Sequence, residues 1–306
     1  MANKLTPPGT IINIGTHCLH MISGGTESSL PTIVFEHGAG GSALMWSLVY
    51  PEIAKLTRVV VYDRAGYGWS EAGPVPRTNE KCVEELHELL MQARIDGPII
   101  LVGHSYGGIN ARLYANRYPN QVRGMVLVDA THEDELTDRF PREHHKGQEM
   151  GAKMMRVFAF LSKIGILRVL AACKMVPGFS KAIGGCPPEV QKMLWKKSFQ
   201  TSALTATGSE FSHLPLGYEL VRKAPDLGEI PLTVIAAGIV DQFAPGTTKE
   251  VQGKIKQALR DAASDTSKLS KNGKLVVAEN SSHNVQLEQP DIVINAIKEM
   301  VTANTF

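Results

Sequence analysis

Short β-branched runs alternate with helical patterns along the chain, and this alternation is the feature that most limits its fold. The runs span residues 32–35, 58–62, 98–102, 122–128, 231–237 and 274–278. They are apolar at successive positions, which is typical of central strands in a parallel sheet covered on both faces. Helical patterns at residues 79–93, 109–118 and 291–301 separate several of them, and residues 11–22 alternate as in a hairpin. The sequence predicts an α/β fold, with a mostly parallel central sheet flanked by helices and joined by right-handed crossovers.

About a hundred residues between the runs at 122–128 and 231–237 contain no convincing strand pattern. A bare loop of this length is uncommon in a compact domain, so we expect a folded insertion. Helical patterns at 150–173, 188–201 and 209–223 predict that it is helical, with breaks at residues 177–178 and 184–188. We expect a core formed by residues 1–130 and 228–306, and a helical cap or lid formed by residues 131–227.

The composition excludes several classes of protein. Hydrophobic residues make up 43% of the 306 and charged residues 20%, which suits a large core and excludes a highly charged disordered chain. The formal net charge of +2 gives no global field that would indicate nucleic acid. The four cysteines share no C-x-x-C spacing, so reduced thiols are expected rather than a disulfide framework.

Two segments bear on localisation. Residues 1–8 have no apolar stretch behind a basic start, so no secretory signal is expected. The most apolar window, residues 154–176, is interrupted by Arg156, Lys163, Arg168 and Lys174, so it does not predict a spanning helix. We expect a soluble, cytoplasmic protein without stable membrane insertion.

The predicted cap has its own charge balance. Residues 151–200 contain nine Lys or Arg and one acid, Glu189. At about 100° per residue, Arg156, Lys163 and Lys174 fall nearly on one line of a helix, opposite a broad apolar face. This pattern fits a solvated face on a lid helix. It also fits a lid that makes interfacial contact with anionic surfaces or attracts acidic substrates.

A G-x-S-x-G motif, Gly103-His104-Ser105-Tyr106-Gly107, carries the clearest chemical signal. It follows the apolar run at 98–102 and precedes the helical pattern at 109–118, which is the strand–turn–helix setting of a nucleophile elbow. Glycines flank the serine because side chains would clash in so tight a turn. The sequence predicts Ser105 as a strained, exposed nucleophile above the sheet, and a glycine-rich helix start with an N-cap serine is the plainer alternative.

A serine nucleophile needs a base and an orienting carboxylate, in the chain order Ser, acid, His. Asp241 follows the strand at 231–237, and His283 follows the strand at 274–278. We therefore predict Ser105, Asp241 and His283 as the triad. Asp129, which follows the strand at 122–128, is the alternative acid; otherwise it would order nearby loops.

Acyl transfer also needs backbone donors for the oxyanion. The N–H of Tyr106, next to the nucleophile, is one candidate. We expect the second donor in the glycine-rich loop at 36–41 and choose the Ala39 N–H. A plain glycine turn without this role would have the same sequence pattern. We expect His37 in this loop to be a structural hydrogen-bonding residue rather than a base.

Taken together, these features resemble the α/β-hydrolase superfamily, in its lidded serine esterase-like branch. The resemblance covers nearly the whole chain: His37-Gly38, the elbow, Asp241, His283, and residues 63–70, which are similar to the branch's D-R-x-G-x-G-x-S signature. It implies that Ser105 is the nucleophile, Asp241 the acid and His283 the base, with Ala39 and Tyr106 as oxyanion donors. Residues 63–70 would be a structural loop near the pocket. The insertion occupies the family's cap position and resembles no cap whose substrate is known.

Ser105 at the elbow argues against epoxide hydrolases and haloalkane dehalogenases of this fold, which use a carboxylate there. We expect hydrolysis of a small carboxylic ester with an apolar acyl or alkyl group, without cofactor or metal. Phe158, Trp195 and Met154 of the cap are the candidate substrate contacts, although such residues also pack a cap's own core. Thioesterase, lactonase, carbon–carbon bond hydrolase, lyase and ligand-binding protein remain alternatives on the same residues.

Overall fold

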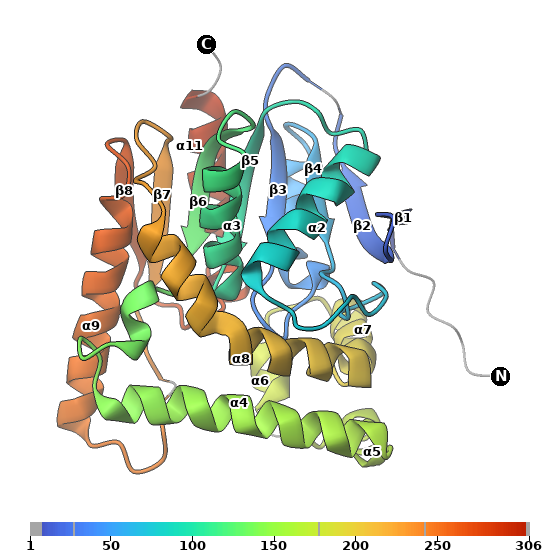
Figure 1. Cartoon of the computed structure of the whole chain (residues 1–306), viewed down its shortest axis with the longest axis vertical. Helices are drawn as coiled ribbons and strands as arrows, with labels where there is room; N and C mark the ends of the chain where they lie inside the picture. Colours follow the sequence, from blue (N-terminus) through green and yellow to red (C-terminus); the bar gives the residue numbers. More distant parts are fainter. Residues whose placement is uncertain (1–7, 27, 177, 242, 304–306) are drawn as a thin grey trace.

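The computed structural model describes residues 8–303 except 27, 177 and 242. Two predictions therefore involve positions outside the described residues. They are the absence of a secretory signal, which concerns residues 1–7, and the cap break at residues 177–178, which includes Pro177. One eight-stranded sheet runs through the molecule in the order β1-β2-β4-β3-β5-β6-β7-β8 (Figure 1). Its strands are β1 Thr10–Asn13, β2 Cys18–Gly24, β3 Thr32–Glu36, β4 Val59–Tyr62, β5 Ile99–His104, β6 Val122–Val128, β7 Leu232–Ala237 and β8 Gly273–Ala278.

The sheet confirms the predicted mostly parallel α/β architecture. β1 and β2 pair antiparallel and β2 meets β4 antiparallel, while every pairing from β4 to β8 is parallel. Nearly all residues of β3 to β7 are buried, because helices cover both faces of the sheet. The carboxyl ends of β5, β6, β7 and β8 lie at one edge, which is where open α/β sheets place their sites.

Helices on the two faces complete the core. α2 (Asn79–Gln92), α3 (Tyr106–Arg117) and α9 (Lys249–Ser267) lie on one face, and α11 (Pro290–Ala303) lies on the other (Figure 1). The short helices α1 (Tyr50–Ile53) and α10 (Val285–Glu288) pack against α11, and η1 (Ala43–Trp46) packs against α10. Helix α9 was not predicted, because its many polar residues leave only a narrow apolar stripe of Ile255, Ala258 and Ala262.

The inserted segment is helical where it is described. It contains η2 (Glu133–Leu136), α4 (Arg142–Lys163), α5 (Ile166–Ala172), α6 (Phe179–Ala182), α7 (Pro188–Lys197) and α8 (Thr201–Lys223). The single helix predicted over 150–173 is wrong, because Gly165 adopts a φ of +87° and separates α4 from α5. The predicted alignment of Lys174 with Arg156 and Lys163 on one helix is wrong for the same reason. No helix among the described residues has the length and apolar character needed to cross a membrane.

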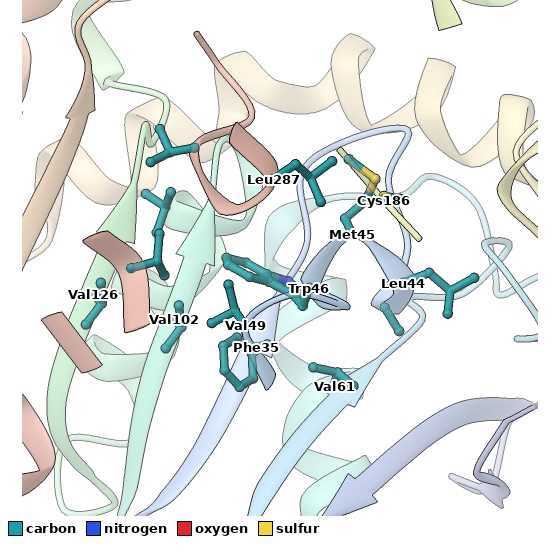
Figure 2. Close-up of a cluster of buried hydrophobic side chains, with 14 of the residues drawn as sticks. Phe35, Leu44, Met45, Trp46, Val49, Val61, Val102, Val126, Cys186 and Leu287 are labelled. Atoms are coloured by element: carbon teal, nitrogen blue, oxygen red, sulfur yellow. The ribbon is translucent and has the colours of Figure 1, made fainter. Parts of the chain in front are cut away.

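Alternate positions along the strands face the two helical layers. Phe35, Val61, Val102 and Val126 belong to a cluster that includes η1 and α11, and Figure 2 shows Phe35 and Trp46 side by side within it. Their ring centroids are 5.1 Å apart. The intervening positions, such as Val34, join α2 and α3 in a second cluster. This period of two fixes the register, because a one-residue slip would reverse both faces.

We predict that Phe35→Ala lowers the free energy of unfolding by about 3–5 kcal/mol, since it removes a fully buried ring and leaves a cavity beside Trp46. Urea unfolding followed by circular dichroism measures the change. Val75→Ala is the control: Val75 is 69% exposed and should change stability by less than about 0.5 kcal/mol. Equal effects in both variants would contradict the assignment of this cluster as the core.

Candidate functional site

Ser105 lies in the sharp turn between β5 and α3. Its φ of +53° and ψ of −123° are strained for a residue with a side chain. The surrounding glycines are required sterically: a Cβ on Gly103 would lie 2.6 Å from the Gly107 carbonyl oxygen, and one on Gly107 would lie 2.6 Å from the Glu36 carbonyl oxygen. The turn has the geometry of a nucleophile elbow.

His283 pairs with Asp129. Nδ1 of His283 lies 2.7 Å from Oδ2 of Asp129, and Oδ1 of Asp129 accepts a hydrogen bond of 2.9 Å from the Ala237 N–H. Asp129 follows β6 directly and adopts a φ of +40°, a conformation that Asp tolerates better than most residues. Because β6 lies between β5 and β7, Asp129 is one strand away from Ser105. Nδ1 is committed to Asp129, so Nε2 is the nitrogen left for proton exchange.

The prediction that Asp241 is the acid does not agree with this geometry. Asp241 lies four residues beyond β7, where its carboxylate pairs with Nζ of Lys181 at 2.8 Å. The alternative, Asp129, occupies the position beside His283. Both carboxylates follow strands that end at the same sheet edge, so position alone could not separate them. The signal that favoured Asp129 is that it follows its strand without any intervening residue.

The pair favours the charged form of each group. Burial acts to lower the pKa of His283, but the hydrogen bond and negative charge of Asp129 outweigh it and raise this pKa above the usual 6.5. Burial acts to raise the pKa of Asp129, but the hydrogen bond and charge of His283 bring the net shift below its usual value. An imidazolium at this position is therefore stabilised by a carboxylate that stays ionised.

His104 supports His283 from the other side. Its Nε2–H donates a hydrogen bond of 2.8 Å to the His283 carbonyl oxygen, and the two ring centroids are 4.6 Å apart. Burial, with the neighbouring His283 charge, lowers the pKa of His104 to about 3. His104 is therefore a neutral donor that fixes the backbone of His283, a role that its place inside the motif did not reveal.

The loop after β3 passes directly over the elbow. A Cβ on Gly38 would lie 3.2 Å from Cβ of Ser105, so glycine permits this approach. The Gly38 carbonyl oxygen accepts hydrogen bonds from His37 Nδ1 at 2.7 Å, from the Gly41 N–H at 3.1 Å and from Arg64 Nη2 at 3.3 Å. Because a peptide unit is planar and trans, fixing this carbonyl also fixes the direction of the Ala39 N–H.

The candidate donors Ala39 and Tyr106 flank Ser105. Ala39 and Ser105 line one cavity, and Tyr106 is the first residue of α3. The N–H groups of the first turn have no partner within a helix, so the Tyr106 N–H is available to an anion. His37 is a structural residue, as expected: its Nε2 accepts a hydrogen bond of 3.2 Å from the Arg64 N–H.

Arg64 connects the loop after β3 to the cap. Its guanidinium is 1% exposed and bonds Glu36 at 2.8 Å, Glu210 of α8 at 2.9 and 3.0 Å, and the His37 carbonyl oxygen. Tyr67 donates a hydrogen bond of 2.8 Å to Glu210 and accepts one of 3.3 Å from the Gly40 N–H. Sequence analysis placed residues 63–70 near the pocket but missed Glu210, which is 146 residues from Arg64 in the chain.

The cavity has a volume of about 680 Å³ and is lined by Ala39, Ser105, Asp129 and His283. Apolar side chains, including Phe211, Leu214 and Phe243, form part of its wall. Four acids outside the His283 pair also line it, whereas Arg260 is the one Lys or Arg among the described lining residues; the acids are Glu135, Glu143, Glu149 and Asp241.

The three cap residues predicted to contact substrate do not line this cavity. Trp195 is buried against Phe179 and Phe199, with ring centroids 4.7 and 5.7 Å away. Phe158 packs on the same cluster, and Met154 is 46% exposed. The aromatic residues of the cap therefore form its own packed core. Each helix must bury an apolar stripe whether or not it contacts a ligand, so the sequence pattern could not distinguish the two roles.

Comparison with known proteins places this site in a family context. A family model described as alpha/beta hydrolase fold matches residues 31–290. The uncharacterized protein YqjL of Bacillus subtilis is 28% identical over 275 residues, which cover 89% of this chain and 84% of YqjL. The chain spans only a third of an uncharacterized protein of Schizosaccharomyces pombe, to which it is 32% identical over 191 residues covering 62% of the chain.

Solved structures match over nearly the whole length. The epoxide hydrolase CorEH superposes with a TM-score of 0.73 and 17% identity, covering 96% of this chain and 98% of that one. A thermophilic esterase from Thermogutta terrifontis superposes with a TM-score of 0.68 and 20% identity, covering 96% and 98%. At these identities the likeness shows the fold, and it includes enzymes of different chemistry.

We predict that Asp129→Asn lowers the pKa of His283, because the proton on the imidazole loses its carboxylate partner and leaves at lower pH. Titration of the His283 ring proton by NMR measures this, with the resonance assigned from a His283→Gln spectrum. Asp241→Asn is the matched control and should leave the pKa of His283 unchanged. If the pKa of His283 fell in Asp241→Asn and not in Asp129→Asn, Asp241 rather than Asp129 would be the carboxylate partner of His283.

Proposed function

The chain belongs to the α/β hydrolase fold family, and we propose that it is a serine hydrolase that cleaves carboxylic esters through an acyl-enzyme on Ser105. The observation that carries the proposal is the hydrogen-bonded pair of His283 and Asp129 in the same cavity as the strained Ser105. A serine hydroxyl is a weak nucleophile at neutral pH, and a histidine oriented by a carboxylate is the arrangement that activates it.

The chemistry follows from these positions. Nε2 of His283 takes the hydroxyl proton as Ser105 Oγ bonds to the ester carbonyl carbon, and the carbonyl electrons move to the oxygen. The N–H groups of Ala39 and Tyr106 stabilise that oxyanion. Its collapse breaks the bond to the alkoxide, which receives the proton from His283. Water then attacks the acyl carbon and gives its proton to His283. A second collapse releases the acid and returns the proton to Ser105.

Ser105 also separates this proposal from the chemistry of some structural neighbours. Epoxide opening on this fold uses a carboxylate nucleophile, and the elbow of this chain has a hydroxyl instead. Thioesters and lactones would follow the same steps as esters, and they remain within the proposal's reaction class.

The cavity lining supports an uncharged or cationic ester rather than an anionic one. Apolar side chains suit an acyl or alkyl group, while the acids Glu135, Glu143 and Glu149 would repel a carboxylate. This lining opposes the expectation, drawn from the basic cap sequence, that acidic substrates are attracted. No Lys or Arg of the described cap residues lines the cavity, although Lys181 pairs with the lining residue Asp241.

We predict that the protein hydrolyses p-nitrophenyl butyrate and that Ser105→Ala reduces kcat to within about 10³–10⁴-fold of the uncatalysed rate. A fluorophosphonate probe should label the wild type and not the variant. Neutral His283 is the base and its pKa is raised, so kcat/KM should fall as pH decreases through a midpoint above 6.5. Undiminished turnover in Ser105→Ala would refute the acyl-enzyme. Labelling without turnover would indicate a binding protein.

We also predict that Arg64→Lys lowers kcat about 10–100-fold with little change in KM, because the Gly38–Ala39 peptide loses a fixing hydrogen bond. Arg77→Lys is the matched control: Arg77 is equally buried and pairs with Glu85, but it donates no bond to this loop. Thermal unfolding of both variants separates stability from rate. Tyr67→Phe, which removes the hydroxyl between Glu210 and Gly40, tests the same connection without removing a charge. Equal losses of kcat in Arg64→Lys and Arg77→Lys would contradict a positioning role.

A further inference from the structure

The outer surface of the cap exposes an unusual concentration of apolar side chains. Of seventeen large hydrophobic residues that are exposed in the described chain, eight lie between residues 150 and 175. They are Met150, Met154, Val157 and Phe160 on α4 and Ile164 directly after it, at helical spacing along one stripe. Ile166 and Val169 of α5 and then Met175 extend the stripe. Single exposed apolar residues are ordinary, but a contiguous group indicates an interaction surface.

Met150, at one end of the stripe, also lines the cavity. The other α4 residues of the stripe lie on the side of the helix opposite its packed side. Met155, Phe158 and Ala159, on the other side of α4, pack against the buried core cluster. α4 contacts α8 along its length, and Figure 1 shows α4 at the lower edge of the molecule with α8 between it and the sheet. The inner side of α4 therefore makes the contacts that hold this helix in the fold. The outer stripe is not needed for those contacts.

Five cations accompany the stripe, and no acid does. Residues 150–176 contain Lys153, Arg156, Lys163, Arg168 and Lys174 and neither Asp nor Glu. All five side chains are exposed, and within the described chain none of them forms an ion pair with a carboxylate. Arg156 and Arg168 bond the hydroxyls of Ser212 and Thr201, which leaves their charge unneutralised.

We propose that this cap surface, residues 150–175 of α4, α5 and the turn after them, docks on an anionic lipid surface. An exposed apolar stripe combined with unpaired cations is the pattern of helices that lie in a membrane interface, where apolar groups enter the acyl boundary and cations meet the headgroups. A second copy of this chain fits less well, because it would bring five cations against five. The proposal concerns binding and does not depend on the esterase activity.

The experiment measures co-sedimentation of the purified chain with vesicles. Phosphatidylcholine vesicles containing about one third phosphatidylglycerol should bind the protein much more strongly than pure phosphatidylcholine vesicles, and added salt should weaken that binding. The triple variant Lys153→Gln, Lys163→Gln, Lys174→Gln should lose roughly a hundredfold in partitioning, at about fivefold per lysine. Phe160→Ser with Val169→Ser, at side chains that are 62% and 64% exposed, should lose at least about tenfold.

Matched variants control for charge and apolarity elsewhere on the protein. Lys223→Gln, Lys249→Gln, Lys298→Gln makes the same charge change at other exposed sites, and Leu56→Ser with Val75→Ser makes the same kind of apolar change. Both should bind as the wild type does, and circular dichroism should show all variants folded. Equal losses in the control variants, equal binding to neutral vesicles, or no binding at all would each overturn the proposal. So would a dimer, measured by sedimentation velocity, that Phe160→Ser dissociates.

Discussion

The buried ionic group around Arg64 is the interaction on which the arrangement of the site depends. One guanidinium joins Glu36 at the end of β3, the carbonyls of His37 and Gly38 in the loop that follows, and Glu210 in the middle of α8. Two carboxylates share this single cation, and the hydroxyls of Tyr62 and Tyr67 supply further donors. Removing one member of such a group leaves an uncompensated buried charge, at a cost of about 3–5 kcal/mol. The group thus fixes sheet, loop and cap relative to one another.

Strained backbone conformations also help to position the residues of the site. Of the four described residues other than glycine with positive φ, Ser105 and Asp129 lie in the site. Each immediately follows a strand, β5 or β6, whose ladder is held by both neighbours. The rigid sheet can impose a conformation that would cost on the order of 1–3 kcal/mol in a free chain. As a result, Ser105 and Asp129 both emerge at the sheet edge beside one cavity, where Asp129 bonds His283, and neither depends on a mobile loop for its position.

The sequence predicted the features that local physics determines. Strands β3 to β8 were placed to within about two residues because period and β-branching determine them, and the elbow was found because its glycines have a steric reason. Features set by distant contacts were not predictable. The choice of acid depended on whether Asp129 or Asp241 contacts His283, and this is decided by the path that each loop takes after its strand. Glu210 carried no local signal, and the aromatic residues of the cap reported packing that any helix requires. The break at Gly165 was visible as a glycine, but its left-handed conformation was not.

The same ionic group constrains how the cap could open over the cavity beside Ser105. If the cap opened by swinging α8 away from the sheet, Glu210 would leave Arg64, and both charges would be separated in a site where each is fully buried. The cost of that separation would accompany every such opening, and the loop after β3 would lose its support each time. Entry is therefore easier through segments that carry no such bond to the loop, namely α4 and the residues after β7, which also line the cavity. In this arrangement α8 belongs functionally with the sheet. The outer part of the cap, with its exposed apolar stripe, is the part free to respond to a surface.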